Sequence, residues 1–242
     1  HYNLAGILAD MGDLAGAEWE FKRAVAIDPS NWRGHYGLGG VYLIRGDRDA
    51  ALAAFREAES LAPENAGIAN SIGLILFYRG ETGPARASFE KALRLDPALV
   101  EARLNLGGLL AQAGQLGEAA EHFTAALDSD RENAQAWYNL GRIRELQGNL
   151  DEAARCYEEL LRRHPRDAGA RKALAAILIR LGREEAAIGQ LQALAAAGAA
   201  DAESHIDLGV LLARRGDYDA ALASYRRAGE LHGGAHPRLY YN

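Results

Sequence analysis

Glycine recurs in this chain at a fixed interval of 34 residues. Five residues after each glycine stands an alanine, four residues further on stands a large side chain, and three beyond that usually stands a small one. Spacings of four and three place these columns on one face of a helix. A period of this length predicts an array of similar units rather than one globular core. The glycine column consists of Gly12, Gly46, Gly80, Gly114, Gly148, Gly182 and Gly216.

The residues around each glycine predict two helices per repeat. An amphipathic segment precedes the glycine, and within it Leu or Ile is followed by Gly or Ala, a small residue that lets a second helix approach closely. The glycine of the column can adopt the left-handed backbone conformation that commonly ends a helix. The second helix stops near a proline such as Pro63 or Pro165, and Asn65 or Asp167 then stands where a cap opens the next helix. The predicted fold class is therefore all-α.

Composition agrees with a folded helical chain and excludes some partners. Hydrophobic residues make up 49% and charged residues 25% of the 242 residues, so a substantial core can form. The formal charge of −6 argues against sequence-independent binding of nucleic acid and against an anionic membrane surface. We find no apolar run long enough to span a bilayer, so membrane insertion is not predicted. The compartment stays open, with the cytoplasm slightly favoured, because a chain that begins with His1 is expected to lack its natural N-terminus.

The fifth repeat carries the clearest family likeness. The stretch Trp-Tyr-Asn-Leu-Gly at 137–141, followed by Gly148, Ala153, Tyr157 and Pro165, closely resembles the tetratricopeptide repeat (TPR) consensus. The resemblance covers essentially the whole chain. It implies a single right-handed superhelical solenoid of antiparallel helix hairpins over 1–242, cut from a longer protein, with the first helix of each hairpin lining a concave groove. The repeats are expected at approximately 1–31, 32–65, 66–99, 100–133, 134–167, 168–201 and 202–235, with 236–242 starting a further helix.

The same resemblance implies a protein-interaction scaffold that binds a peptide-like segment of a partner in the groove. The groove-facing columns are expected to be apolar in repeats two and three and basic in repeats five to seven, and one of these columns includes Leu104 and Ile206. Such a surface suits a segment with hydrophobic anchors and a carboxylate-bearing flank. The residues expected to form the partner-binding groove are Tyr36, Phe77, Tyr78, Asn105, Tyr138, Asn139, Arg142, Lys172 and Arg180.

No constellation of residues predicts catalysis, so the chain is not expected to be an enzyme, and no cofactor is expected. Cys156 lies on a helix with no base placed beside it by the repeat, which favours a partly buried inert thiol. His232 and His236 are separated by two glycines, so a shared metal site is not predicted. The glycine-rich stretch from Gly34 to Gly40 falls inside a helix with no preceding strand, which argues against a phosphate-binding loop.

Several alternatives stay open at the level of sequence. The array is alternatively the substrate-recruiting arm of a larger enzyme such as a glycosyltransferase, or a scaffold that self-associates through uncapped ends. The basic stretch from Arg162 to Arg183 is interpreted as a solvated face rather than an anion site. Trp19 is expected on the outer face of a second helix, as another contact point or as packing for an upstream region. Gly198 is the expected position of a soft joint or of a frayed helix end.

Overall fold

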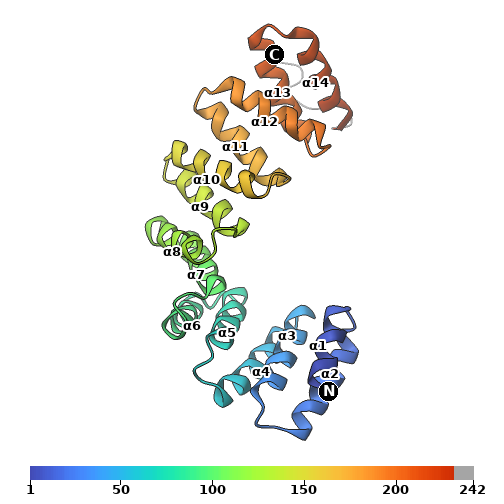
Figure 1. Cartoon of the computed structure of the whole chain (residues 1–242), viewed down its shortest axis with the longest axis vertical. Helices are drawn as coiled ribbons and strands as arrows, with labels where there is room; N and C mark the ends of the chain where they lie inside the picture. The colour runs from blue at the N-terminus through green and yellow to red at the C-terminus, as the bar shows by residue number, and fades with distance from the viewer. Residues whose placement is uncertain (232–242) are drawn as a thin grey trace. The chain divides into compact units, whose positions relative to one another are not determined.

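The computed structural model describes residues 1–231, and throughout this range every regular element is an α-helix (Figure 1). The helices are α1 (Tyr2–Asp10), α2 (Leu14–Ile27), α3 (Trp32–Ile44), α4 (Arg48–Leu61), α5 (Ala66–Tyr78), α6 (Thr82–Leu95), α7 (Val100–Gln112), α8 (Leu116–Ser129), α9 (Ala134–Leu146), α10 (Leu150–Arg163), α11 (Ala168–Arg180), α12 (Glu184–Ala196), α13 (Ala202–Arg215) and α14 (Tyr218–Leu231). The expected further helix at 236–242, together with His232 and His236, lies outside the described residues.

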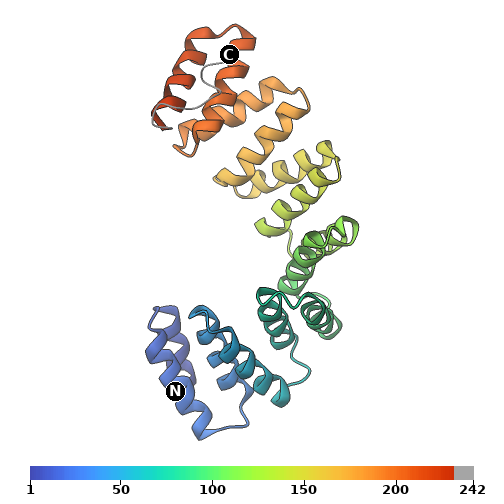
Figure 2. The same cartoon turned by 180° about the vertical axis from the view of Figure 1, so that it is seen from behind.

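The helices pair into consecutive hairpins, each made of an odd-numbered first helix and an even-numbered second helix (Figures 1 and 2). The chain divides into two compact units, unit 1 (His1–Arg131) and unit 2 (Glu132–Asn242). Within each unit, the second helix of a hairpin also packs against the first helix of the next, as α4 does against α5 and α10 against α11. Helical repeats are thus present in both units, and the single solenoid over 1–242 stays a prediction.

Turn glycines and capping side chains set the helix ends as the sequence predicts. All seven members of the glycine column have positive φ, between 69° and 89°. This backbone conformation is costly for residues with a side chain, so each glycine ends a helix where another residue would be strained. Five of the odd-numbered helices begin with a capping side chain, whose oxygen accepts a hydrogen bond from a backbone N–H in the first turn. This bond satisfies a donor that the helix itself leaves unpaired. These caps are Asn31, Asn65, Asn133, Asp167 and Asp201.

Gly198 ends α12 in the same way. Its φ is 68°, and its backbone N–H donates to the carbonyl of Ala195. The N–H of Ala199 then reaches back to the carbonyl of Leu194, which closes the last turn. Position 199 lacks the proline that follows other second helices, and the left-handed glycine stops the helix instead. Of the two alternatives for this segment, a soft joint and a frayed helix end, the structure shows a helix end, and its last turn is hydrogen-bonded.

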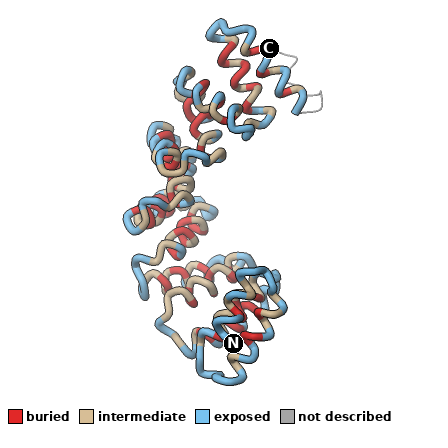
Figure 3. The backbone as a smooth tube through the Cα atoms, turned by 45° about the vertical axis from the view of Figure 1, so that its right-hand side comes forward, coloured by how far each residue is buried: buried red, intermediate tan, exposed pale blue. Residues whose placement is uncertain are grey.

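Aromatic rings of the second helices fill the hairpin cores by lying against glycines of the first helices. A Cβ at position 39 would lie 2.6 Å from ring atoms of Phe55, so only glycine admits the ring at this distance. A Cβ at the equivalent glycines would likewise lie 2.7–2.9 Å from ring atoms of Phe89, Phe123, Tyr157 and Tyr225. Figure 3 shows the result, with buried residues on the helix sides that face one another and exposed residues outside. None of the described helices is long and apolar enough to cross a membrane.

Candidate partner-binding surface

In unit 1, polar side chains on neighbouring first helices bond to each other. Ser71 Oγ donates to the carbonyl of Gly67, so the hydroxyl of Tyr36 donates in the 3.3 Å hydrogen bond that joins it to Ser71 Oγ. One helix further along, Asn105 Nδ2 donates to Asn70 Oδ1 at 2.9 Å. These bonds tie α3 to α5 and α5 to α7. Tyr36 and Asn105, both expected in the groove, are therefore half-buried and already engaged by their neighbours.

An apolar surface lies beside this network at the ends of α3 and α5. Ile44 is 66% exposed and Tyr78 is 52% exposed, although both are large apolar side chains. Phe77 is half-buried with its ring centroid 5.9 Å from that of Tyr78. The guanidinium carbon of Arg48, the first residue of α4, lies 5.7 Å from the Tyr78 ring centroid. Unit 1 thus exposes an apolar side chain at the end of each of these two helices, with a cation beside Tyr78.

In unit 2, the expected site residues of α9 differ in exposure. The ring of Tyr138 is half-buried and meets the Tyr157 ring edge-on, with centroids 5.7 Å apart. Asn139 is also half-buried, whereas Arg142 is exposed. No ion pair is recorded for Arg142 within residues 1–231, so its charge is available to a partner.

The other two cations of the expected site are held by carboxylates of unit 2. Lys172 Nζ lies 2.5 Å from Asp201 Oδ2, and Arg180 Nη1 lies 2.5 Å from Glu145 Oε1. Burial opposes ionisation of Asp201, but hydrogen bonds from Lys172 and Ser204 outweigh it and lower the pKa of Asp201 to about 2. Asp201 also caps α13. Lys172 therefore supports a helix start as well as presenting charge, which the repeat pattern did not reveal.

The expected groove column is wrong at two positions. Leu104 is 8% exposed and Ile206 is 1% exposed, so neither side chain is available to a partner. Polar or aromatic residues at this position, such as Tyr36 and Asn70, keep an atom at the surface, whereas an aliphatic side chain gains by packing fully against the neighbouring helices. In this column, therefore, Tyr36 and Asn70 remain half-buried, whereas Leu104 and Ile206 belong to the core.

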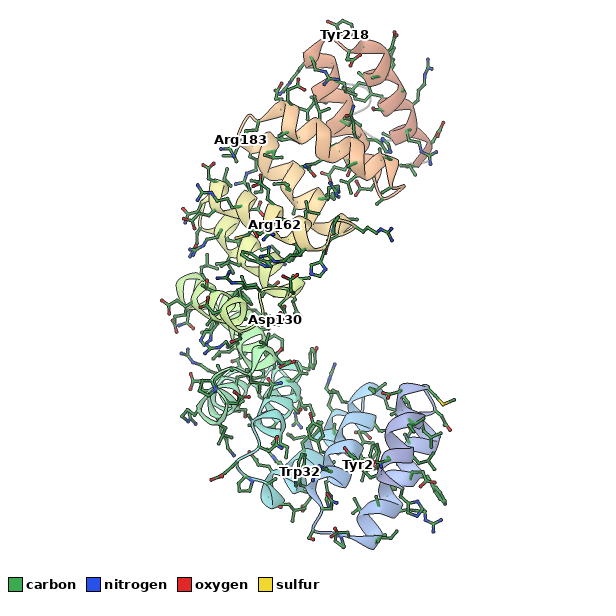
Figure 4. All side chains as sticks on the ribbon, in the orientation of Figure 1. Tyr2, Trp32, Asp130, Arg162, Arg183 and Tyr218 are labelled. Carbon is green, nitrogen blue, oxygen red and sulfur yellow. The ribbon has the colours of Figure 1, made fainter. Side chains whose placement is uncertain are left out.

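The basic stretch from Arg162 to Arg183 is largely paired. Arg162 bonds to Glu159 at 2.8 Å and Arg183 to Asp151 at 2.6 Å, and both side chains extend from the surface of unit 2 (Figure 4). Arg171 donates to the Pro165 carbonyl and to Gln190. Trp19 is 54% exposed, with Arg23 stacked 4.7 Å from its ring centroid. These contacts agree with a solvated face for the basic stretch and with an outer position for Trp19.

Tyr157 is the one fully buried tyrosine among the described residues, and its hydroxyl has no hydrogen-bond partner in the protein. Burial raises the pKa of this hydroxyl well above its ordinary value. A buried hydroxyl without a partner is costly, so Tyr157→Phe is expected to leave the free energy of unfolding unchanged or raise it by about 1 kcal/mol. Urea denaturation followed by circular dichroism measures the change, with Tyr225→Phe as the matched control. A loss above about 1 kcal/mol would show that the hydroxyl is bonded.

Cys156 is buried, and burial raises the pKa of its thiol to about 11. At pH 8 the thiolate is therefore scarce, and reagent access is blocked as well. We expect Cys156 to react with a disulfide reagent such as dithionitrobenzoate only as fast as the protein unfolds. The rate is measured by absorbance with and without 6 M guanidinium, and fast labelling of the native protein would contradict the inert-thiol interpretation.

Within residues 1–231, no group of three or more His, Cys, Asp or Glu side chains lies close enough to hold a metal ion. The stretch from Gly34 to Gly40 lies inside α3, as the repeat predicted. The candidate surface consists of aromatic, apolar and charged side chains on the first helices, together with Arg48 of α4.

Comparison with known proteins agrees with the helical repeats. One tetratricopeptide repeat model matches residues 2–66, 71–130 and 185–235. A second tetratricopeptide repeat model matches residues 110–177 and 146–208. No curated protein matches the chain.

Solved structures share the arrangement of helices. The chain is similar to PilW, described as a widely conserved type IV pilus biogenesis factor, at 26% identity and a TM-score of 0.73, over 87% of this chain and 96% of that one. It is similar to YrrB, described as a TPR protein with an unusual peptide-binding site, at 27% identity and a TM-score of 0.57, over 71% of this chain and 88% of that one. The C-terminal part of a TPR repeat-containing protein from Cytophaga hutchinsonii is 14% identical with a TM-score of 0.79, over 99% of this chain and 98% of that one.

Proposed function

The chain belongs to the tetratricopeptide repeat family, whose fold is that of a protein–protein interaction scaffold, and we propose that its first helices bind a peptide-like segment of a partner protein. The observation that carries this proposal is the exposure of Ile44 and Tyr78 on α3 and α5. Large exposed apolar side chains that lie together mark interaction surfaces in soluble proteins. YrrB, a relative in fold, is described as having a peptide-binding site, which supports the same use of the fold here.

Each unit offers a different part of the expected site. In unit 1 the contact is apolar and aromatic, through Phe77 and Tyr78, with Tyr36 and Asn105 as rigid polar neighbours. In unit 2 it is cationic and aromatic, through Arg142, with Tyr138 and Asn139 beside it on α9. Lys172 and Arg180 contribute through surface ion pairs, and such exposed pairs hold their charges weakly enough for a partner carboxylate to compete.

The proposal does not include catalysis by this chain. The buried Cys156 thiol has a raised pKa, so it is a poor nucleophile. Binding by the first helices needs no reaction and no cofactor. The recruiting-arm and self-association alternatives are not favoured by any contact of the described residues.

An affinity capture from lysate of the source organism, read by mass spectrometry, tests the proposal. The double variant Ile44→Ser with Tyr78→Ala removes the unit 1 contact, and Arg142→Glu reverses the free charge in unit 2. Trp19→Ala is the matched control on a second helix, and thermal melting checks that all variants fold. We expect at least one partner to be lost with a first-helix variant and kept by the Trp19 variant. Partners kept by every first-helix variant, or lost only with Trp19→Ala, would contradict the proposal.

A further inference from the structure

Two of the exposed apolar residues of unit 1, Ile44 and Tyr78, lie at the same repeat position. Ile44 and Tyr78 are 34 residues apart, each in the last turn of its first helix. The hydrogen bond between Tyr36 and Ser71 joins α3 to α5. At the same position the other first helices carry Asp10, Gln112, Leu146, Arg180 and Arg214. Two consecutive apolar residues at this position are therefore particular to α3 and α5.

Arg48 lies against Tyr78 and has no carboxylate partner in the part of the chain that the structure describes. Its recorded contact is the face of the Tyr78 ring, at 5.7 Å. The neighbouring arginines differ, because Arg45 pairs with Glu18 and Arg79 lies 2.7 Å from Asp49. Arg48 is also the first residue of α4, where a cation meets the positive end of the helix dipole and does not stabilise the helix. Its charge is therefore available to an incoming anion.

We propose that this patch, defined as Ile44, Arg48, Phe77 and Tyr78, binds a partner segment in which two large apolar side chains are followed directly by carboxylates. The inference rests on the proposed function and specifies the chemistry of the partner. The apolar side chains cover Ile44 and Tyr78, and a carboxylate meets Arg48 at the edge of the Tyr78 ring. An anion that arrives there pairs with a guanidinium already held by stacking, so less side-chain freedom is lost on binding.

Geometry sets the spacing of the two apolar anchors. Packed helices lie roughly 8–10 Å apart, and we expect a similar spacing between equivalent residues of α3 and α5, which a side-chain hydrogen bond joins. A peptide in the polyproline II conformation advances about 3.1 Å per residue and has three residues per turn. Side chains three residues apart therefore lie on one face of the segment, about 9 Å apart, and reach the two positions together. The partner motif is an apolar residue, two intervening residues, a second apolar residue and then acidic residues.

Fluorescence anisotropy with synthetic peptides tests the motif. The acidic probe is labelled Ser-Leu-Gly-Ser-Phe-Glu-Glu-Ser with blocked ends, so that its carboxylates are side chains only. Matched probes replace both glutamates by Gln, both by Lys, or Leu and Phe by Ser. We expect the acidic probe to bind at least tenfold more tightly than the Gln probe, and the Ser probe to show no saturable binding. Equal binding of the acidic and Gln probes, or no saturable binding of the acidic probe, would overturn the inference.

Protein variants identify the site. Arg48→Glu is expected to reverse the preference, so that the Lys probe binds more tightly than the acidic probe, and Tyr78→Ala to weaken the acidic probe at least tenfold. Arg56→Glu, an exposed charge change on the same helix, is the matched control and should leave all affinities unchanged. An unaltered preference in folded Arg48→Glu protein would overturn the inference.

The two proposals fail in different ways. If Ile44→Ser with Tyr78→Ala releases a captured protein while the acidic probe binds no better than the Gln probe, the proposed function stands and the acidic motif is wrong. If neither unit's first-helix variants release any captured protein, the proposed function is wrong as well.

Discussion

Replacement of Phe123 by alanine is expected to lower the free energy of unfolding by about 3–5 kcal/mol. Phe123 is 1% exposed, and its Cε1 lies 2.9 Å from where a Cβ at position 107 would be. The ring fills the space that Gly107 leaves on α7, so truncation opens a cavity at the centre of the hairpin. Gly107 has no side chain that could move into this cavity. The expected loss in the free energy of unfolding therefore lies in the upper part of the usual range.

Urea denaturation followed by helical circular dichroism measures this loss. Glu121→Ala is the control, because Glu121 is exposed on the same helix, α8. Repeat proteins gain much of their stability from contacts between neighbouring units, so the α7–α8 hairpin and its neighbour α6 are expected to unfold first. A Phe123→Ala variant as stable as the Glu121→Ala control would show that the ring does not hold the two helices together.

Replacement of Ala85 by leucine is expected to lower the free energy of unfolding by about 1–3 kcal/mol through overpacking. Ala85 is fully buried on α6, and its carbonyl oxygen lies 3.2 Å from where a Cβ at position 73 would be. The two helices of the hairpin are therefore in close contact at this point, and three extra carbon atoms have no space. Relief requires α5 and α6 to move apart, which loosens the contact between Phe89 and Gly73.

The matched control is Ala87→Leu, two residues further along α6 at an exposed position. The same side chain is added there without a neighbour to displace, so stability should change by less than about 0.5 kcal/mol. Thermal and urea denaturation of both variants measure the difference. Equal stability of the two variants would contradict the assignment of the alanine column to the buried hairpin interface.

Most of the fold follows from residues that act locally. The glycine column forces a left-handed conformation, and caps such as Asn65 satisfy the first turn, so helix ends are readable from single positions. The small residues before the column, such as Gly141, predict close approach because nothing else admits a ring there. Gly198 follows the same rule outside the column, since a left-handed glycine ends a helix where the sequence left a soft joint and a frayed helix end as alternatives.

The candidate site is less readable from sequence, because its chemistry depends on contacts between repeats. Lys172 and Arg180 looked like available cations, but their partners Asp201 and Glu145 are 29 and 35 residues away in the chain. The repeat pattern did not single out Arg48, because its contact is with the ring of Tyr78 on the next hairpin, 30 residues later in the chain. Polarity separates Leu104 from Asn70 at the same repeat position: the aliphatic side chain is buried, whereas Asn70 stays half-buried with its amide oxygen bonded to Asn105.

The central claim is that the first helices bind a partner protein, and hydrogen–deuterium exchange with a captured partner tests it most directly. With the purified partner bound, we expect slower exchange in peptides from α3 and α5, or from α9 and α11, and little change in peptides from α6, α8 and α10. Slower exchange confined to the second helices, such as α2 around Trp19, would contradict the claim and place the interaction on the opposite side of the hairpins.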